Sequence, residues 1–76
     1  MRSIEDWECR EDGTVILTSY NGDELPIKCD QATFLASVKQ YNAGAMVQTA
    51  FPYLNSTERE FMISGLTPEE QKAIFG

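Results

Sequence analysis

Two glycine-containing turn sequences, Asp12-Gly13 and Asn21-Gly22, constrain the fold of this chain more than any other feature. Both dipeptides are typical of two-residue type I′ hairpin turns, and each lies between segments of strand character. The spacing predicts three antiparallel strands over about residues 4–11, 14–20 and 23–29. We therefore expect a β-meander, in which each strand pairs with the next one along the chain.

If each turn contains only two residues, Cys9 lies opposite Ile16, and Ile16 lies opposite Ile27. This register predicts a core face made of Trp7, Cys9, Ile16, Thr18, Leu25 and Ile27. The opposite face is then mixed in polarity and consists of Glu8, Arg10, Val15, Leu17, Pro26 and Lys28. Pro26 has no backbone N–H to donate to a neighbouring strand, which favours an edge position for the third strand.

The same register separates Cys9 from Cys29 by one intervening strand, or about 9–10 Å at a strand spacing of about 4.8 Å. A disulfide tolerates Cα atoms only up to about 7 Å apart. We therefore expect two free thiols, as in a reducing cytoplasm.

Capping residues predict the helices that follow the strands. Asp30 is a suitable N-cap for a helix over about residues 31–43, whose apolar stripe is Phe34, Leu35, Val38 and Tyr41. Residues 45–50 are weakly helical and end at Phe51-Pro52. Asn55 caps a helix over about residues 56–64 that Gly65 ends, and Thr67-Pro68 begins the last helix.

Short helices are not stable in isolation, so we expect the C-terminal ones to belong to the core. Their apolar residues are Phe61, Ile63, Leu66, Ile74 and Phe75. The predicted fold is one small α+β domain over residues 1–76, with the β-meander in 1–29 and the helical part in 30–76. The helical part holds one longer helix and two or three short ones.

Acidic side chains outnumber basic ones by 12 to 6, which gives a net charge of −6 and argues against direct nucleic-acid binding. Seven of the acids lie in the first 24 residues. We interpret these seven as candidate partner-binding residues for a basic protein: Glu5, Asp6, Glu8, Glu11, Asp12, Asp23 and Glu24. The alternative is ordinary solvated surface that promotes solubility.

The sequence has no His, so the usual Ser-His and Cys-His catalytic arrangements are missing. Two cysteines without a Cys-x-x-Cys motif do not predict a zinc site, and the glycine spacing is not that of a phosphate loop. We expect no catalytic, metal-binding or cofactor-binding residues. No apolar run approaches the roughly 20 residues of a membrane span, and the first six residues lack a signal-peptide core, so we expect a cytoplasmic protein without a membrane partner.

The last third of the chain carries a family-like pattern: Phe51-Pro52-Tyr53-Leu54, Glu58-Arg59-Glu60-Phe61, Ser64-Gly65, Pro68-Glu69 and Phe75-Gly76. It resembles the ends of small, uncharacterised bacteriophage-encoded proteins. Some of those carry Cys-x-x-Cys after the glycine, where this chain has residues 66–69 without cysteine, so a metal site is not implied. The resemblance implies a phage accessory protein acting in a bacterial host, and it assigns no functional residues.

These features favour a non-enzymatic accessory protein that binds and modulates a host protein. In its sharpest form it is an inhibitor that presents carboxylates to a basic, nucleic-acid-handling surface. The alternative is a small structural or assembly component that forms a homodimer or larger assembly. It would self-associate through the face with Val15, Leu17 and Pro26, or through a free sheet edge. An enzyme is the third possibility.

Overall fold

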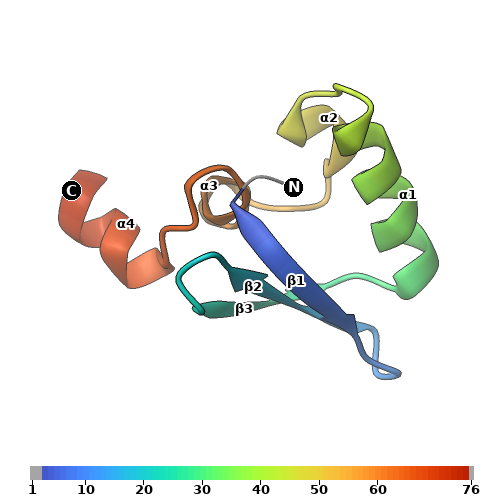
Figure 1. The fold of residues 1–76 in the computed structure, drawn as a ribbon, viewed down its shortest axis with the longest axis horizontal. Coiled ribbons are helices and arrows are strands. Elements are labelled where there is room, and N and C mark those ends of the chain that lie inside the picture. The colour runs from blue at the N-terminus through green and yellow to red at the C-terminus, as the bar shows by residue number, and fades with distance from the viewer. Residues whose placement is uncertain (1–2, 76) are drawn as a thin grey trace.

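The computed structural model, which describes residues 3–75, has a three-stranded antiparallel sheet followed by four helices (Figure 1). The strands are β1 (Ile4–Cys9), β2 (Thr14–Ser19) and β3 (Glu24–Lys28), in the order β1-β2-β3. The helices are α1 (Gln31–Asn42), α2 (Val47–Ala50), α3 (Ser56–Ser64) and α4 (Pro68–Phe75). The α+β class and the meander are confirmed. Met1, Arg2 and the Gly76 of the family-like pattern lie outside the described residues.

Helices α1 and α3 lie on one side of the sheet, and α4 extends away from it beyond α3 (Figure 1). The sheet thus has an inner face, toward the helices, and an outer face that no helix between residues 3 and 75 covers.

Both hairpin turns contain three residues, so the prediction of two-residue turns is wrong. The backbone N–H of Arg10 donates to the Thr14 carbonyl at 2.8 Å, and that of Ser19 donates to the Asp23 carbonyl at 2.8 Å. The last residue inside each loop is a glycine with positive φ, 84° at Gly13 and 85° at Gly22. A type I′ turn needs positive φ at both central residues, and between residues 3 and 75 every positive φ belongs to a glycine.

The additional turn residue shifts the register of β2 by one position against both of its neighbours. Trp7 lies opposite Leu17, and Leu17 lies opposite Leu25. Because side chains alternate along a strand, this shift exchanges the two faces of β2. The predicted core face was therefore wrong for Ile16 and Thr18, which are half-buried on the outer face.

Val15 and Leu17, assigned by the sequence to the opposite face, are completely buried. The predicted inner residues of the other two strands are correct: Trp7, Cys9, Leu25 and Ile27 all contact the core. Cys9 and Cys29 are free thiols, as expected.

Aromatic rings join the sheet to the helices. Trp7 of β1 lies edge-on to Phe34 of α1, with ring centroids 5.6 Å apart, and Phe34 contacts Phe51 at 5.9 Å. Phe51, which the sequence indicated only as the end of a weak helix, is completely buried. On α1, Leu35 was expected in the apolar stripe but is exposed, and Ser37 is buried instead.

The capping predictions for the helices are confirmed. The Asp30 carboxylate accepts a hydrogen bond from the Thr33 backbone N–H at 3.2 Å. Hydrogen bonding by the side chain and then the backbone of Thr33 holds the pKa of Asp30 below its usual value. Asn55 and Glu58 form a reciprocal capping box at the start of α3, with hydrogen bonds of 2.8 and 3.0 Å. Gly65 ends α3 in the left-handed conformation.

The expectation that both C-terminal helices belong to the core holds only for α3. Phe61 is completely buried, and Leu66 is half-buried. Ile63, Ile74 and Phe75 are exposed, so their assignment to the core was wrong. The buried residue of α4 is Gln71, whose side-chain amide donates to the backbone carbonyls of Thr57 and Leu66, both at 2.9 Å. A polar anchor, rather than an apolar stripe, attaches α4.

The register predicts opposite outcomes for neighbouring residues of β2. Leu17→Ala removes a completely buried side chain and should lower the free energy of unfolding by about 2–5 kcal/mol, whereas Ile16→Ala should cost about 1 kcal/mol or less. Urea denaturation of both variants measures the difference. A larger loss for Ile16→Ala would contradict the register.

The two C-terminal helices should respond differently to loss of a phenylalanine. Phe61→Ala should destabilise the fold by about 3–5 kcal/mol because its ring is completely buried. Phe75→Ala, which truncates a side chain 65% exposed, should change stability by less than about 0.5 kcal/mol. Equal losses in parallel denaturation curves would show that α4 packs into the core.

Candidate functional site

The outer face of the sheet consists of three rows of side chains that run across the strands. Asp6, Thr18 and Glu24 form one row, and Glu8, Ile16 and Pro26 form the next. The third row contains Thr14 and Lys28, which are paired, and Arg10, which is hydrogen-bonded to Thr14 across the turn. The register therefore places Asp6, Glu8 and Glu24 on one surface.

Four of the seven predicted carboxylates gather at the end of the sheet that holds the second turn. We call this group the acidic end: Glu5, Asp6, Asp23 and Glu24. Asp23 follows that turn, and Glu24 and Asp6 flank Thr18 in the adjoining row. An irregularity in the pairing between Ile4 and Asp6 leaves Glu5 and Asp6 both exposed, although they are adjacent in sequence.

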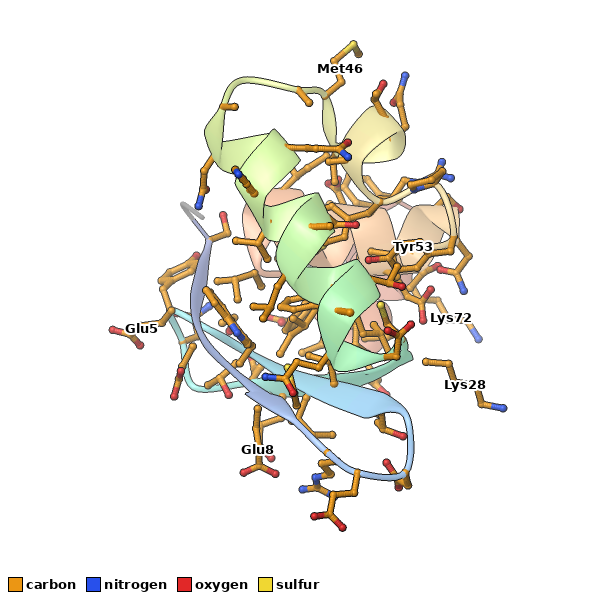
Figure 2. All side chains as sticks on the ribbon, turned by 90° about the vertical axis from the view of Figure 1, so that its right-hand side faces the viewer. Glu5, Glu8, Lys28, Met46, Tyr53 and Lys72 are labelled. Carbon is orange, nitrogen blue, oxygen red and sulfur yellow. The ribbon has the colours of Figure 1, made fainter. Side chains whose placement is uncertain are left out.

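The other three predicted carboxylates lie elsewhere. Glu8 is in the middle row, where its carboxylate pairs with the Arg10 guanidinium at 2.8 Å. Glu11 and Asp12 occupy the first turn, at the opposite end of the sheet. Figure 2 shows Glu8 pointing away from the helices and Glu5 projecting from the side of β1. The seven carboxylates therefore do not form a single patch.

Local hydrogen bonds distinguish the members of the acidic end. The Asp6 carboxylate accepts a hydrogen bond from the Trp7 backbone N–H at 2.8 Å, which fixes it beside its own strand. Within residues 3–75, the carboxylates of Glu5, Asp23 and Glu24 have no hydrogen bond or ion pair. They remain available to bind cationic groups.

Two basic residues, Arg10 and Lys28, mark the other end of the outer face. Both residues were predicted from the sequence to lie on a mixed face, without a functional role. They lie opposite the acidic end, and because β2 shifts equally against β1 and β3, the predicted register places them there as well. The outer face is therefore acidic at one end and basic at the other.

Cys29 and Tyr53 form a small polar cluster beneath α1. The Tyr53 hydroxyl donates to Ser37 Oγ at 3.0 Å, and the Cys29 thiol donates to the Asp30 carbonyl at 3.4 Å. Burial raises the pKa of both Cys29 and Tyr53. Raised pKa values favour the protonated form of both groups.

A shallow hollow that was not predicted from the sequence lies between α3 and α4. Its lining comes from Thr57 of α3 and from one side of α4, where Pro68, Gln71, Lys72 and Phe75 recur at helical spacing. That spacing was visible in the sequence, but Phe75 was assigned to the core. Between residues 3 and 75 there is no cluster of three metal-ligating side chains.

Within the same range, the helices are too short or too polar to cross a membrane. Comparisons with protein-family models, curated proteins and solved structures found no match.

Proposed function

We propose that this chain is a non-enzymatic phage accessory protein that binds a basic host protein through the acidic end of its sheet. The phage origin and the host cytoplasm rest on the sequence pattern of residues 51–76. The observation that most directly supports binding to a basic protein is the arrangement of carboxylates around one end of the sheet: Glu5, Asp6, Asp23 and Glu24.

Charge complementarity is the reason to expect a basic partner. All four of these carboxylates have no ion pair within residues 3–75, and three of them, Glu5, Asp6 and Glu24, are exposed. Carboxylates on a rigid sheet present fixed negative charge to a cationic surface, much as phosphates do, and this supports an inhibitor of a nucleic-acid-handling protein. Such contacts increase the association rate more than the final affinity.

The alternative of a self-associating component needs a different surface from the one first expected. Val15 and Leu17 are inside the core, so a face containing them is not accessible to a partner. Self-association then depends on the outer face with Ile16 and Pro26, or on the β1 and β3 edges.

The proposed binding site predicts a position-dependent effect of charge removal. The variant Glu5→Gln/Asp23→Asn/Glu24→Gln should bind the partner with an association rate reduced about tenfold at low salt, and with a weaker salt dependence. The partner is first isolated from bacterial lysate with the full chain and identified by mass spectrometry. Association rates are then measured over a series of salt concentrations.

The matched control is Glu11→Gln/Glu60→Gln/Glu69→Gln, which changes the net charge by the same amount away from the acidic end. Its association rate should stay close to that of the unaltered chain. Equal slowing by both triple variants would mean that only total charge matters. Failure of the unaltered chain to retain any basic protein would contradict the proposal itself.

A further inference from the structure

The outer face of the sheet is complementary to itself in charge. Its basic row holds Arg10, Thr14 and Lys28, and its acidic row holds Asp6, Thr18 and Glu24. Between them lies a middle row of Glu8, Ile16 and Pro26. If a second copy is rotated by 180° about an axis that runs along the middle row, across the strands, its acidic row faces the basic row of the first copy.

We propose that a second copy of this chain docks on the outer face, with the strands of the two sheets antiparallel. In this arrangement Arg10 lies over Asp6 of the second copy, and Lys28 lies over Glu24 of the second copy. Symmetry doubles both contacts, which gives four ion pairs around a centre formed by Ile16 and Pro26. Ile16 is only half-buried and Pro26 is exposed in the single chain, so docking removes apolar surface from water.

Charge selects this orientation over the other symmetric one. A rotation about an axis parallel to the strands would place the acidic row on the acidic row and the basic row on the basic row, which is repulsive. Stacked sheets usually keep their strand directions within about 30° of each other, and the proposed orientation meets that requirement.

Glu8 is the one residue of like charge that meets its own copy across the axis. Its carboxylate is already paired with the Arg10 guanidinium at 2.8 Å. A guanidinium has five N–H donors in all, so Arg10 can hold Glu8 of its own chain and Asp6 of the second copy together. The repulsion at the centre is therefore compensated within each chain.

The size of the face sets the strength of the dimer. Three strands at about 4.8 Å spacing and five residues at about 3.4 Å rise cover roughly 14 by 17 Å. A stable interface buries about 800 Å² on each partner, well above the area of this face. The dimer is therefore weak, forms at high concentration and low salt, and exchanges rapidly.

This inference goes beyond the proposed function and does not depend on a host partner. Docking covers Asp6 and Glu24, so the dimer and a basic partner compete for part of the same surface. Dilution or a basic partner then releases the single chain.

Paired charge reversals test whether opposite charges on this face hold the two copies together. Arg10→Glu/Lys28→Glu makes the face wholly acidic, and Asp6→Lys/Glu24→Lys leaves Glu8 as its only acid. Each variant alone should remain monomeric in sedimentation experiments at about 1 mM and low salt, where the unaltered chain is partly dimeric. An equimolar mixture of the two variants should form a heterodimer, because every contact except that between the two Glu8 side chains is then between opposite charges.

Two control variants have the same changes in net charge, but their substitutions lie outside the outer face. Lys39→Glu/Lys72→Glu matches the first variant, and Glu11→Lys/Glu69→Lys matches the second; both should dimerise like the unaltered chain. A monomeric unaltered chain at about 1 mM, or dimers of either face variant alone, would overturn the proposal. If a variant of the outer face does not fold, the proposed dimer can be tested by NMR on the unaltered chain. The amide signals of Ile16 and Thr18 should then shift on dilution, and unchanged signals would reject the proposed dimer.

Discussion

The register of β2 is the constraint on which the rest of the structure depends. Gly13 and Gly22 complete three-residue turns in the left-handed conformation, and each turn offsets β2 by one residue from a two-residue hairpin. The offset directs Val15 and Leu17 toward the helices. The offset moves β2 equally against β1 and β3, so Asp6 stays in line with Glu24 and Arg10 with Lys28, and only the β2 residues between them change.

The helices were predictable from sequence because their limits are set locally. Asp30 and Asn55 bond to backbone groups three residues ahead, which needs no knowledge of the rest of the fold. The strands and their order followed from the turn sequences for the same reason. The register did not, because Asp-Gly and Asn-Gly suit both two-residue and three-residue loops. The choice depends on φ at Asp12 and Asn21, which the packing of the whole sheet influences.

Burial of individual aromatic residues was also a long-range property. Phe51 and Phe75 both end or follow short helices, yet Phe51 lies in the core and Phe75 is exposed. Of the candidate site, the sequence predicted the exposed carboxylates but not their division into an acidic end and separate groups. It also gave no role to Arg10 and Lys28, although the predicted register already aligned them at the other end of the same face.

The register can be tested directly by NMR contacts between Hα protons. Hydrogen bonds at Ser19–Asp23 and Gly13–Cys29 make Ile16–Pro26 a non-hydrogen-bonded pair, in which Cα atoms approach to about 4.5 Å. The account predicts strong Hα–Hα contacts between Pro26 and Ile16, and between Trp7 and Leu17. Contacts from Leu17 to Pro26 and to Glu8 would instead indicate two-residue turns, and would contradict the burial of Val15 and Leu17 described above.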